Sequence, residues 1–288
     1  RRYSTYCRNY DGNSLFKIAS GASDYDYNWT KVLMDRVGGR MHGLSLHYYT
    51  VSGWNGSKGA ATQFSKDDYY WTLGKCREIE DVIKKHCTIM DEYDPQKNVA
   101  LMLDEWGTWW DTEPGTNPGH LYQQNTLRDA FVASLSFDIF HKYTDRLKMA
   151  NIAQIVNVLQ SMILTSGKNM VLTPTYIPLE LNCDMMDVRD NRRIPMVSAT
   201  ASKDPNGKIH ISMSNVDADN AQEVTINLSG TKAKKAVGEI LTSTNLTDYN
   251  SFENPDNVKP VPFKEVKINK DILKIKLPAK SIVTIELQ

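Results

Sequence analysis

Two adjacent carboxylates, Asp104 and Glu105, follow directly on an unbroken apolar run, Val99–Leu103, and tryptophans come next. An apolar run of strand length is typical of a strand that is buried on both faces in a parallel sheet. A carboxylate at the end of such a strand, beside aromatic rings, suits chemistry on a molecule with an apolar face and many hydroxyl groups. Sugars have this character, so the stretch indicates a carbohydrate site.

The alternation of side chains along a strand decides which carboxylate points inward. Leu101, Leu103 and Glu105 share one face of the expected strand, whereas Met102 and Asp104 share the other. We therefore expect Glu105 to face the interior of the fold. The alternative is that both carboxylates begin a solvated loop, and the neighbouring tryptophans count against it.

Further polar side chains stand at the ends of other expected strands. His47 and Tyr49 end the strand-like run 41–50. Tyr49 is a candidate hydrogen-bond partner that would hold the Glu105 carboxylate ionised and oriented, although it could equally be a core tyrosine. For His47 a buried structural role is the simpler interpretation. Gln154 would be an unusual core residue without a polar partner, which favours a role in the site.

The sequence lacks the catalytic motifs of several other enzyme classes. It contains no HExxH, no GxSxG and no Cys/His set with metal-ligand spacing, so we expect no metal and no cofactor. The four cysteines form no CxxC pair, and we expect them to be reduced: Cys7, Cys76, Cys87 and Cys183.

Strands and helices alternate between residues 15 and 187. The expected strands are 15–23, 41–50, 99–105 and 151–159, and the expected helices are 28–37, 65–90, 121–143 and one within 173–186. This order predicts right-handed crossovers and a parallel sheet. Four such units are half of an eight-stranded (β/α)₈ barrel.

The pattern changes near residue 190. Five β-branched runs that alternate apolar and polar residues follow, separated by turn sequences, at 208–216, 223–230, 236–242, 265–277 and 281–287. They predict an antiparallel β-sandwich. The expected fold is therefore α/β plus all-β, with half of a barrel at 1–188 and a sandwich domain at 189–288.

Charge and hydropathy exclude two classes of partner. The 34 basic and 34 acidic residues give a formal net charge of zero, so no basic field would attract nucleic acid. No apolar run is long enough to span a membrane, and no signal peptide is visible. We expect a bacterial protein of the cytoplasm or periplasm that acts on a carbohydrate partner.

Four motifs, SLHYYT, LDEWGTWW, DRLKMANIAQIVNVLQSMI and VLTPTY, occur in this order. Together they resemble the α-L-arabinofuranosidases of glycoside hydrolase family 51, and the resemblance runs from about residue 15 to the end. It implies a (β/α)₈ barrel joined to a β-sandwich, the same order of parts as above. It also implies hydrolysis that releases terminal α-L-arabinofuranosyl residues from arabinan- or arabinoxylan-type glycans, with retention of configuration.

The resemblance also implies roles for single residues. Glu105, in the DEW motif, corresponds to the nucleophile, and Tyr49, in the His-X-Tyr motif, to the residue that orients it. Gln154 corresponds to a residue that contacts the bound arabinose, Trp109 lines the sugar site, and His47 is assigned to sugar binding as well.

One part of the family's machinery is missing from the sequence. The Gly-Asn-Glu motif that carries the acid/base does not occur in the 288 residues. Retaining hydrolysis needs two carboxyl groups about 5–5.5 Å apart, so we expect these residues alone to have little or no activity. Half of a barrel would also leave two open sheet edges, which allows a homo-oligomer. Two alternatives stay open: a carbohydrate-binding protein without catalysis, and a related β-xylosidase or endoglucanase.

Overall fold

The chain divides into two compact units, which are described separately. The computed structural model describes residues 2–176, 185–188, 192–204, 206–228, 231, 233, 235–269 and 271–288. The first unit comprises Arg1–Thr50, Glu78–Gly107 and Ile139–Ala153, and the second comprises Val51–Arg77, Thr108–Asp138 and Gln154–Gln288.

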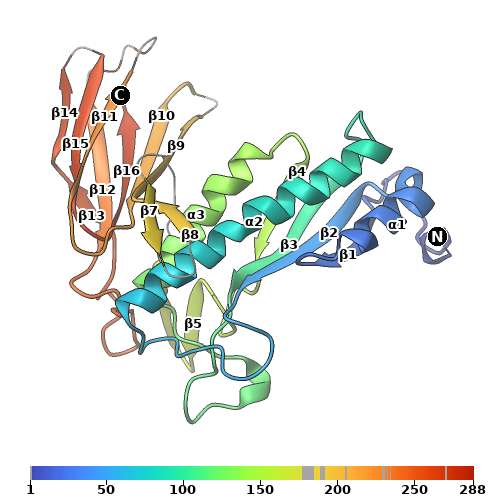
Figure 1. Cartoon of the computed structure of the whole chain (residues 1–288), viewed down its shortest axis with the longest axis horizontal. Coiled ribbons are helices and arrows are strands. Elements are labelled where there is room, and N and C mark those ends of the chain that lie inside the picture. Colours follow the sequence, from blue (N-terminus) through green and yellow to red (C-terminus); the bar gives the residue numbers. More distant parts are fainter. Residues whose placement is uncertain are drawn as a thin grey trace. The chain divides into compact units, whose positions relative to one another are not determined.

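A four-stranded sheet forms the centre of the first unit. Its order is β1-β2-β3-β4, with β1 parallel to β2 and β3 parallel to β4. The strands are β1 (Ile18–Ser23), β2 (Gly43–Thr50), β3 (Ala100–Thr108) and β4 (Leu147–Ile152), drawn from blue to green in Figure 1. Helix α1 (Tyr27–Val37) connects β1 to β2. The predicted alternation of parallel strands and helices is therefore confirmed.

Two longer helices connect the later strands, and side chains fix where each one begins. Helix α2 (Lys66–Tyr93) follows Ser65, whose hydroxyl accepts from the Asp68 backbone N–H at 3.1 Å while the Asp68 carboxylate accepts from the Ser65 N–H at 3.1 Å. This is the reciprocal capping box. Helix α3 (Leu127–Lys142) begins six residues later than the 121 expected. Its start is capped by Asp129, which accepts from the Thr126 N–H, and by the Thr126 hydroxyl, which accepts from the Arg128 N–H.

Strand β4 ends earlier than the apolar pattern predicts. The expected strand 151–159 is wrong beyond Ile152, where β4 ends. The backbone turns at Asn157 (φ 57°) and Leu159 (φ 42°), both in the left-handed region that a strand cannot contain. Residues 153–159 therefore form a loop after the carboxyl end of β4.

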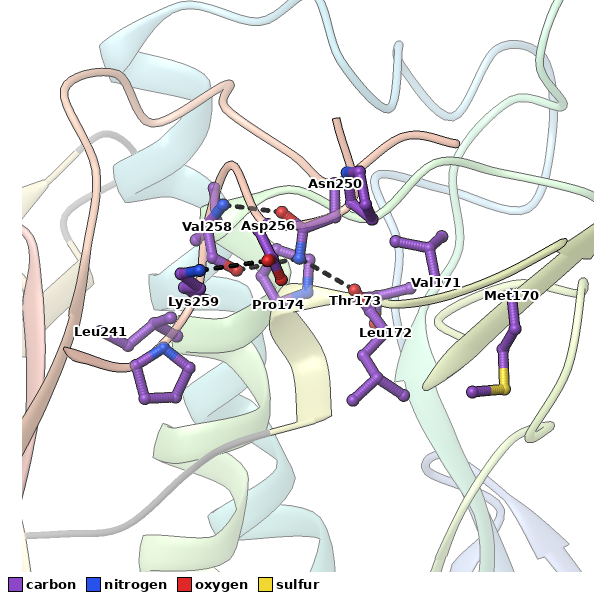
Figure 2. A pocket seen from close by; sticks show the side chains of 12 residues that line it. Met170, Val171, Leu172, Thr173, Pro174, Leu241, Asn250, Asp256, Val258 and Lys259 are labelled. Atoms are coloured by element: carbon purple, nitrogen blue, oxygen red, sulfur yellow. Dashed lines mark hydrogen bonds and ion pairs between the residues drawn. The ribbon is translucent and has the colours of Figure 1, made fainter. Parts of the chain in front are cut away.

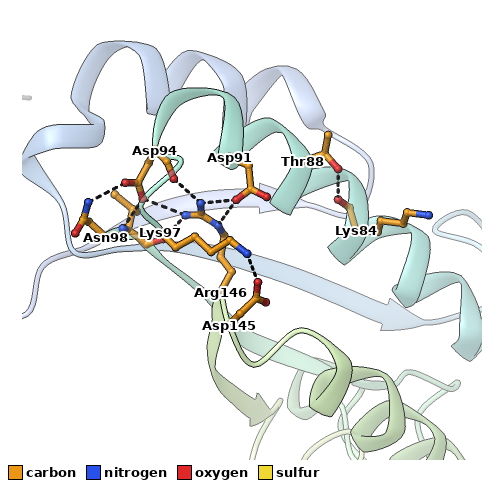
Figure 3. Close-up of polar contacts among 9 residues, drawn as sticks. Lys84, Thr88, Asp91, Asp94, Lys97, Asn98, Asp145 and Arg146 are labelled. Atoms are coloured by element: carbon orange, nitrogen blue, oxygen red, sulfur yellow. Dashed lines mark hydrogen bonds and ion pairs between the residues drawn. The ribbon is translucent and has the colours of Figure 1, made fainter.

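A buried arginine connects three elements of the first unit. Arg146, at the start of β4, donates to the Asp91 carboxylate of α2 at 2.5 Å and to the Val99 carbonyl before β3 at 2.8 Å. It also donates to the Asp94 carboxylate at 3.1 Å (Figure 3). The Arg146 side chain is 1% exposed and Asp94 is 10% exposed, so the guanidinium is shielded from water where it joins the segments before β3 and β4.

The second unit contains a β-sandwich. Its sheets have the orders β13-β12-β16-β10-β9 and β11-β15-β14, and their pairings are antiparallel. The larger sheet consists of β9 (Val197–Lys203), β10 (Ile209–Asn215), β12 (Ala236–Thr242), β13 (Val261–Phe263) and β16 (Ser281–Leu287). The smaller consists of β11 (Gln222–Asn227), β14 (Val266–Asn269) and β15 (Ile272–Leu277). Apolar side chains of both sheets, such as Met213 and Leu273, form one core, which confirms the predicted sandwich.

The remaining elements are short. They are the hairpins β5 (Ile163–Ser166) with β6 (Asn169–Leu172) and β7 (Met185–Val188) with β8 (Arg192–Pro195), and the 3₁₀ helices η1 (Tyr3–Thr5), η2 (Gly38–Arg40), η3 (Pro118–His120) and η4 (Pro174–Tyr176). Most of the helix expected within 173–186 falls on residues 177–184, outside the described part, as does Cys183. Cys7, Cys76 and Cys87 are free thiols, as expected. Among the described helices, none is both long and apolar enough to cross a membrane.

Candidate active site

Strand β2 presents three polar side chains on one face. Ser45, His47 and Tyr49 alternate along the strand, so they point in the same direction. The Ser45 hydroxyl donates to the Asp104 carboxylate at 2.7 Å. The His47 ring lies between the two carboxylates of β3, with Nδ1 2.7 Å from Glu105 Oε2 and Nε2 3.2 Å from Asp104 Oδ1. The structure therefore brings together His47, Tyr49 and Glu105, which the sequence singled out.

Both carboxylates face His47 because β3 contains an irregularity. Leu103 pairs with Ala150 and Trp106 with Ile152, so three steps along β3 match two along β4. The additional residue is a bulge at Asp104 and Glu105, and a bulge redirects the side chains near it. The expectation that Asp104 would point away from Glu105 is therefore wrong.

Tyr49 is a buried residue that interacts with Glu105. Its side chain is 5% exposed. Burial raises the pKa of the Tyr49 hydroxyl, and a hydrogen bond to Glu105 and the charge of that carboxylate raise it further. A phenol that keeps its proton is a permanent donor to the carboxylate.

The site is open on the side of the charged groups. The side chains of His47, Asp104 and Glu105 are 40%, 31% and 34% exposed. A ligand can therefore reach these three groups, whereas Tyr49 is buried.

The three tryptophans of the motif have different surroundings. Trp106 is buried and packs edge-on against Phe140, with ring centroids 5.2 Å apart. Trp110 is buried as well, and its indole N–H donates to the Asp129 carboxylate at 2.9 Å. Of the three, Trp109 alone is partly exposed, so it is the one that a sugar could contact.

Trp109 belongs to the second unit and has an aromatic neighbour that the sequence did not single out. Trp54, on the glycine-rich loop after β2, meets Trp109 edge-on at 5.5 Å and is 51% exposed. The Lys58 ammonium lies 5.6 Å from the centre of the Trp109 ring. A tryptophan within a loop of glycines and serines was the available signal for this residue.

Gln154, also in the second unit, is exposed. The argument that it must be a core residue in need of a partner therefore does not apply, and its proposed role rests on the family motif alone. The buried glutamine of this segment is Gln160, which accepts from the Thr108 N–H at 2.8 Å and donates to the Asp129 carbonyl at 2.6 Å.

Two pockets of the second unit differ in the residues that line them. One, of about 560 Å³, is lined by polar groups of the loop after β2, including Ser57, Lys58 and Gln63. The other, of about 220 Å³, lies beside Asn250 (Figure 2). There the Asn250 amide donates to the Leu172 and Val258 carbonyls, and its oxygen accepts from the Val258 N–H, so it serves to join the two segments.

The described residues contain no group of three or more His, Cys, Asp or Glu side chains arranged to hold a metal ion.

Comparison with known proteins identifies the class. The family described as alpha-L-arabinofuranosidase C-terminal domain matches residues 104–281. An intracellular exo-alpha-L-arabinofuranosidase of Bacteroides ovatus is 76% identical over 302 residues, covering 100% of this chain and 59% of that protein. The crystal structure of a family 51 arabinofuranosidase from Xanthomonas axonopodis pv. citri matches with a TM-score of 0.94 and 43% identity, covering 100% of this chain and 61% of that one.

A more distant structure shows the same fold. A family 51 alpha-L-arabinofuranosidase from Bifidobacterium longum matches with a TM-score of 0.78 at 21% identity, covering 94% of this chain and 58% of that one. The fold is thus the second half of a (β/α)₈ barrel followed by an antiparallel β-sandwich. The chain belongs to the family 51 α-L-arabinofuranosidases, and it spans about three fifths of the relatives it matches.

Proposed function

We propose that this chain is part of a retaining α-L-arabinofuranosidase that releases terminal arabinofuranosyl residues from arabinan- or arabinoxylan-type glycans. Family membership supports the reaction class. The observation that carries the proposal is that the partly exposed Glu105, at the bulge of β3, lies 2.7 Å from His47 Nδ1 and interacts with the buried Tyr49 hydroxyl.

In this reaction the Glu105 carboxylate attacks the anomeric carbon while the bond from that carbon to the leaving oxygen breaks. The leaving oxygen takes a proton from a carboxylic acid outside these 288 residues, because the sequence holds no Gly-Asn-Glu. Water then attacks the anomeric carbon of the ester, gives a proton to the same acid/base, and releases arabinose and free Glu105. Tyr49 orients the nucleophile, and Gln154 and Trp109 contact the sugar.

We further propose an intracellular location, supported by the name of the Bacteroides ovatus relative. The proposed domains are a half-barrel at 1–188 and a sandwich at 189–288.

Replacing the nucleophile in the native-length protein tests the proposal. With an aryl α-L-arabinofuranoside, Glu105→Ala should abolish turnover, and azide should restore part of it by attacking the anomeric carbon in place of the carboxylate. Glu92→Ala, which removes an exposed carboxylate on α2, is the matched control and should behave like the wild type. Unchanged turnover by Glu105→Ala contradicts the assignment.

The alternative is a protein that binds a carbohydrate without hydrolysing it. The exposed Trp54 and the partly exposed Trp109 favour it, because aromatic rings suffice to bind a sugar. It predicts calorimetric binding of arabinan or xylan by a native-length protein that hydrolyses neither glycan nor aryl glycosides.

A further inference from the structure

His47 contacts two carboxylates at once, and this geometry limits what it can do. Glu105 Oε2 lies 2.7 Å from Nδ1 and Asp104 Oδ1 lies 3.2 Å from Nε2. Both ring nitrogens are therefore engaged within the chain. An imidazole has two nitrogens only, so none is left to hydrogen-bond a sugar hydroxyl.

The contacts form a continuous series across β2 and β3. Ser45 donates to Asp104, Asp104 lies against His47 Nε2, and His47 Nδ1 lies against Glu105, whose charge also acts on the Tyr49 hydroxyl. Asp104 therefore has two partners, one hydroxyl and one ring nitrogen, and it fixes the ring from the side away from Glu105.

From these contacts we propose that His47 is a positioning residue for Glu105 and that Asp104, braced by Ser45, orients His47. This assignment differs from the sugar-binding role expected for His47 from the sequence. It rests on the proposed function, because it assumes that Glu105 is the nucleophile.

Glu105 needs positioning residues because a nucleophile that rotates freely reacts more slowly. A carboxylate on a two-bond stem rotates freely unless donors hold it, and attack requires one oxygen to point at the anomeric carbon. His47 and the Tyr49 hydroxyl together restrict the rotation of Glu105. An imidazole is a well-directed donor only if its own rotation is blocked, and Asp104 blocks it, as a carboxylate does for other functional histidines.

Two substitutions of His47 separate its two contacts. In His47→Asn the side-chain amide nitrogen takes the place of Nδ1 and can still donate to Glu105. In His47→Gln the amide nitrogen takes the place of Nε2 and reaches Asp104 instead. Both variants replace the ring by a side-chain amide, and they differ in the carboxylate that this amide can reach.

The experiment uses the native-length protein and an aryl α-L-arabinofuranoside, with L-arabinose as the competing sugar. We expect His47→Gln and Asp104→Ala to lower kcat about 10- to 100-fold, with the inhibition constant of arabinose changed less than twofold. His47→Asn keeps a donor to Glu105 but loses the contact with Asp104, so it should lose about as much kcat as Asp104→Ala and less than His47→Gln. Asp104→Asn, which keeps a polar atom against Nε2, should recover most of the loss of Asp104→Ala.

A double-mutant cycle completes the test. If Asp104 acts through His47, adding Asp104→Ala to His47→Asn should cause no further loss of kcat. Equal kcat values in His47→Asn and His47→Gln, or a loss of arabinose affinity that parallels the loss of kcat, would overturn the proposal. Turnover by the wild type and its loss in Glu105→Ala are measured with the same substrate, so failure of the proposed function is seen separately.

Discussion

The buried imidazole of His86 has a tautomer that its partners determine. Nε2 lies 2.9 Å from the Asp24 carbonyl, which can only accept, so Nε2 carries the proton. Nδ1, 2.8 Å from the Thr30 hydroxyl, then accepts from it. The neutral ring satisfies both partners, and burial lowers the pKa of His86.

This residue predicts a loss of stability in mild acid. In the unfolded chain His86 takes up a proton below about pH 6.5, whereas the folded chain resists it, so the free energy of unfolding falls as the pH drops from 6.5 toward the folded pKa. The slope for one group is at most about 1.4 kcal/mol per pH unit. Urea unfolding between pH 7.5 and 5 should show this slope reduced in His86→Gln. His120→Gln, at an exposed histidine, is the control and should leave it unchanged.

Part of the candidate site could be predicted from the sequence. The grouping of His47, Tyr49 and Glu105 followed from the ends of parallel strands, a rule that depends on chain order alone. The exposure of Gln154 and the contact between Trp54 and Trp109 could not be predicted, because each depends on how a loop folds. Loops are fixed by turns and contacts that periodicity does not record.

At the level of elements, β1 and β2 approach each other at one glycine. A Cβ atom built on Gly21 would lie 1.5 Å from the Ser45 carbonyl oxygen. No side chain fits there without moving β1 away from β2. Ser45 also donates to Asp104, so the same movement would disturb the carboxylates.

Gly21→Ala should therefore destabilise the protein by at least about 3 kcal/mol, the upper part of the usual range for overpacking, and reduce turnover in what remains folded. Thermal denaturation measures the first effect and an arabinofuranoside assay the second. Gly39→Ala is the matched control, since nothing lies within 4 Å of its Cβ position, and a melting temperature equal in the two variants would refute this account.

The Arg146 cluster gives a second prediction for the first unit. Arg146→Met keeps the length of the side chain but leaves the Asp94 carboxylate, 10% exposed, without its guanidinium partner. Breaking a buried pair by removing one member costs about 3–5 kcal/mol. Urea unfolding should show this loss, whereas Lys97→Ala, which removes an exposed pair with Asp145, should cost less than about 1 kcal/mol. Equal losses would mean that the arginine is not structural.

The elements themselves were predicted unevenly, for identifiable reasons. The start of α2 followed from the Ser65 and Asp68 pair, but the equivalent pair of Thr126 and Asp129 was not used, and α3 was placed six residues too early. The orientation of Asp104 failed because the bulge arises from pairing with β4, a contact between segments more than 40 residues apart in sequence. Periodicity within one strand cannot record such a partner.

At the scale of the whole molecule, the chain covers 59% of the Bacteroides ovatus relative, and the acid/base motif of the family is absent from its 288 residues. The 288 residues alone should therefore turn over an aryl arabinofuranoside at least about 10²- to 10⁴-fold more slowly than the native-length protein, which is the usual loss without general acid catalysis. The comparison needs both proteins at equal concentration. Equal rates would place the acid within these residues.

The bulge in β3 has a practical consequence for identifying the nucleophile by chemical trapping. An arabinose-configured epoxide or fluoro-sugar would form an ester with the attacking carboxylate, and digestion followed by mass spectrometry would find the modified peptide. Since Asp104 and Glu105 are consecutive and both face His47, the mass of that peptide alone cannot assign the ester. Only fragment ions that break the bond between residues 104 and 105 distinguish them, and we expect those ions to locate the label on Glu105.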